Sequence, residues 1–365
     1  MIYIHVPFCR RKCNYCAFNS KIGSEAEKNS YVDALIAEIN LRGDCSKVET
    51  IYFGGGTPTT LNFNQLEKIL GAVRKNFYVD ERAEITIEAN PGTVDKNYLR
   101  GLKDLGFNRL SLGVQSFDDE LLKILGRIHT ARTAIETVAD AKIFFTNVSV
   151  DLMYGLPNQT LDKLRRDVEI LKSLNVEHIS IYGLEIEEGT KFFELARAGK
   201  LNLPDENICA DMYDFITETL PALGYNRYEI SNFAKKNFES RHNLGYWTGK
   251  KYFGFGAGAH SFDGKLRTSN VRDVATYIKK NIPVVEEVVT REAAMEEFCF
   301  LGLRVVEGIS AQTFKNKFGA SIFEIFGAVI DKNIRRGLLE VDGDKIFLTR
   351  RGMSLGNEVF ADFLL

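Results

Sequence analysis

The chain begins MIYIHVPFCRRKCNYCAF (residues 1–18), where a short apolar run leads directly into three cysteines. Cys9, Cys13 and Cys16 have the spacing C-x3-C-x2-C. A structural zinc site is closed by four ligands, and a [4Fe–4S] cluster is usually held by four cysteines. Three thiolates on a short loop can hold three irons of such a cluster and leave the fourth iron open. An open, redox-active iron indicates chemistry rather than structure alone.

Two other interpretations of the loop remain open: a zinc site completed by His5 or a distant residue, and a disulfide with one spare thiol. No apolar signal sequence precedes Cys9, which predicts a cytoplasmic chain whose thiols stay reduced. The isolated cysteines Cys45, Cys209 and Cys299 are expected to be small buried hydrophobes, because free Cys usually packs that way.

Short apolar runs alternate with helix-like stretches as far as about residue 183. The runs lie at 1–6, 48–53, 83–88, 107–112, 147–153 and 178–182. The helix-like stretches, with apolar residues at three- and four-residue steps, lie at 31–42, 64–76, 96–105, 131–142 and 161–173. Six strands separated by single helices predict βα units and a parallel sheet.

Polar and glycine-rich segments stand where each predicted strand ends, at 9–16, 54–59, 88–91, 115–117, 151 and 185. In a barrel of parallel strands, the carboxyl ends of the strands meet at one mouth and carry the active site. A doubly wound sheet would concentrate its ligand contacts near one switch point. The sequence therefore favours an α/β fold with a partial (β/α)6 TIM-like barrel.

The pattern changes after residue 182. Residues 190–240 are expected to form helices with loops, and 240–270 a glycine-rich insertion that ends in strands. Helical stretches at 293–305, 311–318 and 321–336 then precede two β-rich runs joined by Asp342-Gly343-Asp344, and an Asp-Gly pair is a strong hairpin signal. This order predicts a small winged-helix-like C-terminal domain. We place the domains at 1–285 and 286–365.

Composition argues against nucleic acid and membrane partners. Of the 365 residues, 45% are hydrophobic and 26% charged, and the formal net charge is −2, as in an ordinary soluble globular protein. Residues 311–351 carry eight Lys or Arg against five acidic residues, too small an excess for a surface that follows a phosphate backbone. No apolar run reaches the ~18 residues of a membrane-spanning helix, so membrane contact is expected only at the periphery, through a membrane-bound recipient.

Five further segments carry a family resemblance. They are YIHVPFC (3–9), GGGTPT (54–59), GVQSF (113–117), Gly126-Arg127 and DLMYGLP (151–157). In this order, along nearly the whole chain, they resemble the oxygen-independent coproporphyrinogen III oxidase family of radical S-adenosylmethionine (SAM) enzymes. The glycines by themselves predict only close approach of a ligand to the backbone, or a tight turn.

The resemblance implies two cofactors. Cys9, Cys13 and Cys16 would ligate a [4Fe–4S] cluster whose open iron is chelated by SAM. Tyr3 would lie nearby, and the methionine part of SAM would contact Gly55, Gly56 and Thr57. The remaining polar contacts to SAM would come from Glu88, Gln115, Arg127 and Asp151.

The chain departs from the oxidases of this family in three ways. Phe18 stands where they carry a fourth cysteine, and the chain begins with the strand that they reach only after an N-terminal extension. RHNLGYW (241–247) matches the H-N-x-x-Y-W signature of the HemW-like branch, a group regarded as heme chaperones. His242 would then offer an imidazole to heme iron, with Tyr246 and Trp247 stacked on the macrocycle.

The same motif has a structural interpretation. His242 and Asn243 would hydrogen-bond a loop while Trp247 fills the core. His260 is a second candidate heme ligand, or a brace for its glycine-rich loop.

Three functions follow from the resemblance. The first is a chaperone that binds heme and passes it to a recipient such as a respiratory heme protein. The second is a radical enzyme that decarboxylates two propionates of coproporphyrinogen III oxidatively to vinyl groups, which Phe18 and the missing extension oppose. The third is a radical enzyme acting on heme or another tetrapyrrole.

Overall fold

A curved nine-stranded sheet forms the centre of the molecule. The structure is a computed structural model that describes residues 1–279 and 283–364. The sheet order is β7-β8-β6-β5-β4-β3-β2-β1-β9, and the strands from β1 to β6 pair side by side in parallel. These six are β1 (Ile2–Val6), β2 (Lys47–Gly55), β3 (Tyr78–Ala89), β4 (Arg109–Gln115), β5 (Val148–Tyr154) and β6 (His178–Gly183). The predicted six-unit partial barrel is confirmed.

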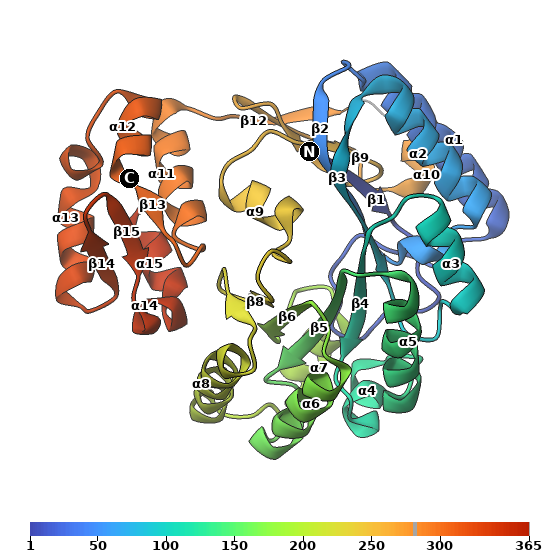
Figure 1. Cartoon of the computed structure of the whole chain (residues 1–365), viewed down its shortest axis with the longest axis horizontal. Coiled ribbons are helices and arrows are strands. Elements are labelled where there is room, and N and C mark those ends of the chain that lie inside the picture. Colours follow the sequence, from blue (N-terminus) through green and yellow to red (C-terminus); the bar gives the residue numbers. More distant parts are fainter. Residues whose placement is uncertain (280–282, 365) are drawn as a thin grey trace.

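Helices connect the strands and cover the outer side of the curved sheet (Figure 1). They are α1 (Glu25–Arg42), the 3-10 turn η1 (Pro58–Thr60), α2 (Phe63–Asn76), α3 (Lys96–Asp104), α4 (Asp119–Leu125), α5 (Ala131–Phe144) and α6 (Leu161–Leu174). Each α-helix of this set begins after a polar residue whose side chain accepts a hydrogen bond from a free N–H of the first turn. These N-cap residues are Ser24, Asn62, Asp95, Asp118, Thr130 and Thr160.

The strands alternate between an apolar outer face and a polar inner face. In β3, Ile85 and Ile87 belong to the main hydrophobic core, whereas Glu84, Thr86 and Glu88 alternate with them. Successive side chains of a strand point to opposite faces of the sheet, so these three face the interior of the barrel. The barrel interior is therefore lined by polar groups on several strands.

The sheet continues beyond the six expected strands on both edges. The strand β9 (Phe253–Phe255) pairs in parallel with β1, with Ile2 opposite Phe253. At the other edge, β8 (Asn232–Ala234) pairs antiparallel with β6, and β7 (Asn226–Arg227) with β8. The glycine-rich segment, expected to be an insertion, thus contributes a strand to the barrel sheet.

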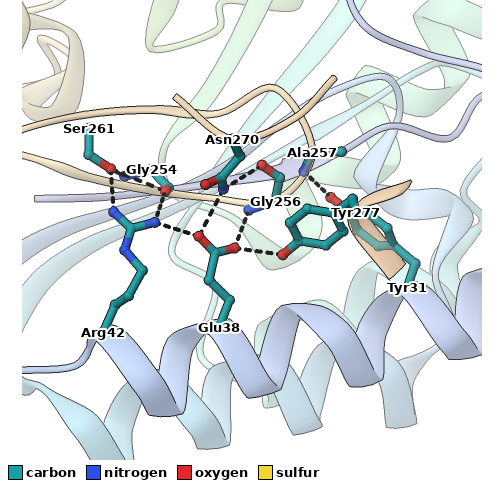
Figure 2. A network of polar contacts seen from close by, with 9 residues as sticks. All are labelled: Tyr31, Glu38, Arg42, Gly254, Gly256, Ala257, Ser261, Asn270 and Tyr277. Atoms are coloured by element: carbon teal, nitrogen blue, oxygen red, sulfur yellow. Dashed lines mark hydrogen bonds and ion pairs between the residues drawn. The ribbon is translucent and has the colours of Figure 1, made fainter. Parts of the chain in front are cut away.

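A buried carboxylate fastens this segment to α1 (Figure 2). Glu38 accepts hydrogen bonds from Tyr277 Oη at 2.6 Å and from Gly256 N at 3.0 Å. It also accepts from Asn270 Nδ2 at 2.8 Å and pairs with Arg42. A buried carboxylate is tolerated because its oxygens are fully hydrogen-bonded and paired with a cation.

The other elements of the first 290 residues lie around this sheet. They are α7 (Lys191–Arg197), α8 (Glu206–Ala222), α9 (Arg241–Trp247), β10 (His260–Phe262), β11 (Leu266–Ser269), α10 (Val274–Lys279) and β12 (Val284–Val288). Strands β10, β11 and β12 form a separate antiparallel sheet. The proposed domain boundary between residues 285 and 286 lies inside β12 and stays a prediction.

The C-terminal part has its own hydrophobic core, which extends from Met295 to Phe363. Its elements are α11 (Arg291–Gly302), β13 (Ile309–Ser310), α12 (Ala311–Phe318), α13 (Ile322–Arg335), β14 (Leu339–Asp342), β15 (Lys345–Leu348), α14 (Arg350–Ser354) and α15 (Gly356–Asp362). The predicted hairpin joins β14 to β15, with Gly343 at a φ of 54° in the turn. Helices followed by this hairpin give the winged-helix-like order that we expected.

The helix α9 lies between the barrel and the C-terminal part (Figure 1), and it contacts both β2 and α11. Throughout residues 1–279 and 283–364, no helix combines the length and the apolar character needed to cross a membrane.

Candidate functional site

The cysteine loop leaves the carboxyl end of β1 and is held at both ends. Cys9 N donates to Lys21 O at 2.9 Å, which closes the loop on itself. In its middle, Asn14 N donates to Leu125 O at 2.9 Å and Asn14 Nδ2 donates to Ile124 O at 2.8 Å. The three thiols are half-buried on this anchored loop.

The thiols do not form a site for a single metal ion. Across the described part of the chain, no group of three or more His, Cys, Asp or Glu residues is arranged to hold one. His5 is engaged elsewhere, since Nε2 donates to Asn19 O at 2.8 Å and Nδ1 accepts from Tyr3 Oη at 3.1 Å. In a [4Fe–4S] cluster each cysteine binds a different iron, so its sulfurs need not converge on one point. The arrangement therefore fits a cluster better than a zinc site completed by His5.

The glycines after β2 allow the cysteine loop to pack closely on the strand. A Cβ on Gly56 would lie 2.8 Å from Phe8 O and 3.0 Å from Cys9 Sγ. Gly55 has a φ of 110°, and a Cβ there would lie 2.6 Å from the His5 ring. Both positions exclude larger residues because of contacts within the protein, in addition to any ligand that approaches this backbone.

Thr57 and Arg127 each lie beside one cysteine of the loop. The Thr57 hydroxyl lies 3.6 Å from Cys9 Sγ, and Arg127 Nη1 lies 3.4 Å from Cys13 Sγ. Asn90 joins them, since its Nδ2 donates to Thr57 Oγ1 at 2.8 Å and its Oδ1 accepts from Arg127 Nη2 at 2.5 Å. A hollow at the surface is lined by Cys13, Thr57, Asn90 and Arg127.

Arg127 keeps one donor free in this arrangement. Its Nε is buried and has no hydrogen-bond partner among the described residues. A guanidinium with one free N–H beside a hollow is suited to donate a charge-assisted hydrogen bond to a carboxylate oxygen.

Glu88 lies on the inner face of β3 and contacts the side chain of Tyr52 on the neighbouring strand β2. Tyr52 Oη donates to Glu88 Oε1 at 2.8 Å, and the Tyr3 ring stacks on Tyr52 with 6.2 Å between centroids. Burial raises the pKa of Glu88 to about 7, although the hydrogen bond from Tyr52 opposes this shift. Glu88 is therefore poised between its neutral and charged forms near neutral pH.

Asp151 occupies the same interior on β5. Ser111 Oγ donates to its two oxygens at 3.2 and 3.3 Å. Burial raises the pKa of Asp151 as well, against the hydrogen bonds from Ser180 and Ser111. Two carboxyl groups inside one barrel are suited to a cationic ligand with hydroxyl groups.

Gln115 has a backbone φ of 71°, which a residue other than glycine adopts only where its surroundings enforce it. Its Oε1 accepts from Tyr182 Oη at 3.2 Å. The following turn is held by Asp167 of α6, which accepts from Ser116 Oγ and Phe117 N, both at 2.8 Å. Burial raises the pKa of Asp167 to about 7.

Asp167 and Asn90 were missed as site residues in the sequence. Asp167 had a visible signal, since it is an acidic residue on the apolar face of α6 that also carries Leu164, Val168 and Leu171. Asn90 belongs to a polar strand end, but its role as a bridge depends on the spatial approach of β2, β3 and the segment after α4.

His242 is placed inside the protein rather than at the mouth. Only 1% of it is exposed, and both ring nitrogens have partners: Thr50 Oγ1 lies 2.8 Å from Nδ1 and Tyr246 Oη 3.1 Å from Nε2. Burial lowers the pKa of His242 to about 3, so the imidazole is neutral at pH 7. The carboxylate of Glu84 accepts from the backbone N–H of Arg241 and His242 and so fixes the start of α9.

The other aromatic residues of this motif contact protein on both sides of α9. The Arg304 guanidinium lies 4.4 Å from the Trp247 ring centroid, and it also lies 5.8 Å from Phe360 of α15. Tyr246 packs edge-on against Tyr252 at 4.8 Å. His260 is exposed at the start of β10. The structure thus places Thr57 and Arg127 beside the cysteines, Glu88 and Asp151 in the barrel interior, and His242 buried against β2.

Two family models match the chain. Residues 3–199 match the radical SAM superfamily, and residues 289–355 match the HemN C-terminal domain. The solved coproporphyrinogen III oxidase HemN from Escherichia coli has the same fold, with a TM-score of 0.88 at 24% identity over 100% of this chain and 89% of that chain. Fold and cysteine loop together define the class of radical SAM proteins.

Comparison with curated relatives identifies a family within this class. The chain is 41% identical to the heme chaperone HemW of Bacillus subtilis, over 99% of this chain and 98% of the relative. It is 39% identical to the Lactococcus lactis heme chaperone HemW, over 100% and 97%. With the Mycobacterium tuberculosis heme chaperone HemW the identity is 35%, over 100% and 94%. The chain belongs to the HemW family of the radical SAM superfamily.

Proposed function

We propose that this protein is a heme chaperone, which binds heme and transfers it to an acceptor protein such as a respiratory heme protein. The observation that carries the proposal is the match over 98%, 97% and 94% of the length of three proteins named heme chaperone HemW. The H-N-x-x-Y-W motif at 242–247 supports it.

In this proposal Cys9, Cys13 and Cys16 hold three irons of a [4Fe–4S] cluster, and SAM chelates the fourth. When bound, the cluster supplies an electron to the sulfonium of SAM. The free Nε of Arg127, 114 positions from Cys13 in sequence but beside it in space, suits the carboxylate of SAM. The close packing of Gly56 on Cys9 keeps this loop next to the end of β2.

The remaining contacts to SAM would come from the polar barrel interior. Glu88 and Asp151 suit the sulfonium and the ribose hydroxyls, and Gln115 is held in place by Tyr182 and by the turn that Asp167 fixes. Gly55 and Thr57 would face the methionine part, with Tyr3 close to it.

Heme binding by His242 would require a local rearrangement. The neutral imidazole is the form that binds iron, and the low pKa of His242 keeps it in that form. Either Thr50 or Tyr246 has to release a ring nitrogen first, because both nitrogens are hydrogen-bonded.

Anaerobic reconstitution of the cluster followed by heme titration and transfer tests the proposal. We expect a saturable heme spectrum, and release of the heme to an apo heme protein such as apomyoglobin added as the acceptor. Cys9→Ala, Cys13→Ala and Cys16→Ala are each expected to lose iron.

The same preparation is then incubated with reductant, SAM and coproporphyrinogen III. Multiple-turnover formation of protoporphyrinogen IX would overturn the chaperone proposal in favour of the oxidase. Failure of the wild type to bind heme would overturn it as well.

A further inference from the structure

Arg109, the first residue of β4, is a buried cation inside the barrel that forms no direct ion pair with any described residue. Only 2% of it is exposed, and it is the largest of the fully buried side chains among the described residues. Within that part of the chain its guanidinium makes no hydrogen bond or ion pair, and its Nε is a buried donor without a partner. Burying a charge without a partner is unfavourable unless another interaction offsets it.

The immediate neighbours of Arg109 do not satisfy it. Thr86 lies directly opposite in the register of β3 and β4, and its Oγ1 is also buried without a partner. On the other side of Arg109, Asn147 O accepts from Leu110 N. The side-chain Oδ1 of Asn147, like Arg109 Nε and Thr86 Oγ1, is buried without a hydrogen-bond partner. A row of three polar residues thus crosses the strands without internal hydrogen bonds between their side chains. Local hydrogen bonding therefore does not account for an arginine at this position.

The two carboxyl groups assigned to SAM stand one step further along the same strands. Glu88 follows Thr86 by two residues, so both face the interior, and Glu88 lies opposite Ser111 in the register. Ser111 follows Arg109 by two residues and donates to Asp151. Arg109, Glu88 and Asp151 therefore share one enclosed interior, where charges interact more strongly than in water.

Other titratable groups face this interior from every neighbouring element. They are Tyr3 on β1, Tyr52 on β2, Glu84 on β3, His178 and Tyr182 on β6, Tyr228 before β8 and His242 on α9. Burial raises the pKa of each tyrosine and lowers that of each histidine, so these groups are neutral at pH 7. Glu84 is bound to the backbone of α9, which leaves Glu88 and Asp151 as the carboxyl groups open to a ligand.

We propose that Arg109 is a positioning residue that acts electrostatically, through Glu88 and Asp151, on the affinity of the barrel for its sulfonium cofactor. The inference rests on the proposed function, since it assumes that these carboxyl groups meet SAM. Burial drives the pKa of both groups upward, and the positive charge of Arg109 opposes the shift in both. Arg109 thereby favours the charged carboxylates that a cationic ligand needs.

The test is the pH dependence of SAM affinity, measured by equilibrium dialysis with the cluster reconstituted anaerobically. In the wild type, affinity should rise with pH and level off as Glu88 loses its proton. Arg109→Gln removes the charge but keeps a polar side chain beside Thr86 and Asn147. We expect the midpoint of its affinity-versus-pH curve to move up by about one pH unit, with about five-fold weaker binding at pH 7 and recovery at higher pH.

Three further variants separate charge from structure. Arg109→Met is a second neutral variant and should show the same upward shift, whereas Arg109→Lys should stay near the wild type. Thr86→Val changes the adjacent residue of the row without changing charge, so its midpoint should match the wild type. The amino group of SAM titrates equally in all of them, so differences between midpoints report on the protein.

If both neutral variants bind SAM with the same pH midpoint as the wild type, the inference is overturned. It is also overturned if Thr86→Val shifts this midpoint as much as the neutral variants do. If only one neutral variant folds, as judged by circular dichroism and the cluster absorbance, that variant decides. A wild type that binds no SAM at any pH would instead overturn the cofactor assignment of the proposed function.

Discussion

Tyr52 links the two candidate binding regions of the barrel through Glu88 and His242. Its hydroxyl donates to the Glu88 carboxyl group at 2.8 Å, while its ring stacks on the His242 imidazole with centroids 5.1 Å apart. A tyrosine of β2 thus contacts both a predicted SAM residue and the predicted heme ligand. The two candidate binding regions therefore share one side chain.

Glu88 should make the stability of the ligand-free protein depend on pH. Its folded pKa of about 7 lies above the ordinary glutamate value of 4.5, so the folded state binds the proton more tightly than the unfolded state. This contribution to stability is complete below the unfolded pKa and is lost as pH rises through about 7. Glu88→Gln keeps a neutral side chain, so relative to wild type it should gain stability at pH 8, on the order of 1–3 kcal/mol.

Thermal unfolding of both proteins at pH 5.5 and 8 measures the effect. Glu25→Gln, an exposed carboxylate on α1, is the matched control and should follow the wild type. A stability difference between Glu88→Gln and wild type that is the same at both pH values would contradict the raised pKa. Because the amide lacks a negative charge, the stabilised variant should also bind SAM more weakly.

Asp167 should support SAM binding without touching SAM. Asp167→Asn leaves one oxygen for the Ser116 hydroxyl and Phe117 N–H and adds an unmatched NH2 group, which loosens the turn after Gln115. A buried hydrogen bond lost in this way costs about 1–3 kcal/mol, so we expect weaker SAM binding with an intact cluster spectrum. Asp162→Asn changes an exposed carboxylate of the same helix and serves as the control.

Equal SAM affinity in Asp167→Asn and Asp162→Asn would show that the turn is held by other contacts. Loss of the cluster absorbance in Asp167→Asn would show that the effect reaches the cysteine loop, which the geometry does not predict.

The sequence predicted the parts of the fold that local patterns specify. The six βα units follow from alternating apolar periodicity, and the β14–β15 hairpin from Asp342-Gly343. It did not predict β9, because three residues of Phe-Gly-Phe become a strand only through pairing with β1. Glu38 holds the residue that follows β9, and it joins α1 to residues more than two hundred positions away.

The candidate site, like the fold, could be predicted from local sequence patterns only in part. The cysteines and polar strand ends are visible in the sequence because each follows a strand in a parallel barrel. The bridge through Asn90 and the orphaned Arg109 depend on which side chains meet across strands, and periodicity carries no such information. The burial of His242 likewise depends on Glu84, whose carboxylate accepts a hydrogen bond from the backbone N–H of His242 at the start of α9.

Tyr246→Phe should strengthen heme binding if His242 is an axial ligand. The substitution removes the hydroxyl that occupies Nε2, so binding no longer has to break that hydrogen bond. A typical hydrogen bond is worth about 1 kcal/mol, which corresponds to a roughly five-fold gain in affinity. His242→Ala should lose the axial-ligand absorbance bands.

Heme titrations of the three proteins, followed by absorbance, compare these effects. Identical spectra for wild type and His242→Ala would remove His242 as a ligand. Weaker heme binding by Tyr246→Phe would instead indicate that the tyrosine itself contacts the ligand.

Arg304 should determine how readily α9 separates from the C-terminal part. Its guanidinium lies between Trp247 of α9 and Phe360 of the C-terminal part, and a cation–π contact of this kind contributes about 0.5–2 kcal/mol. Arg304→Ala should therefore speed hydrogen exchange of the α9 amides. Arg100→Ala removes a cation–π contact between α3 and α5, to Phe144 at 5.7 Å, and should leave α9 unchanged.

The same pair of variants tests whether α9 opening gives heme access to His242. If it does, stopped-flow association of heme should be faster in Arg304→Ala than in wild type or Arg100→Ala, because the buried imidazole becomes available more often. Faster exchange of α9 without faster heme association would mean that heme binds at a surface that needs no opening. Unchanged exchange would mean that other contacts of α9, such as the Glu84 carboxylate at its N-terminus, hold the helix in place.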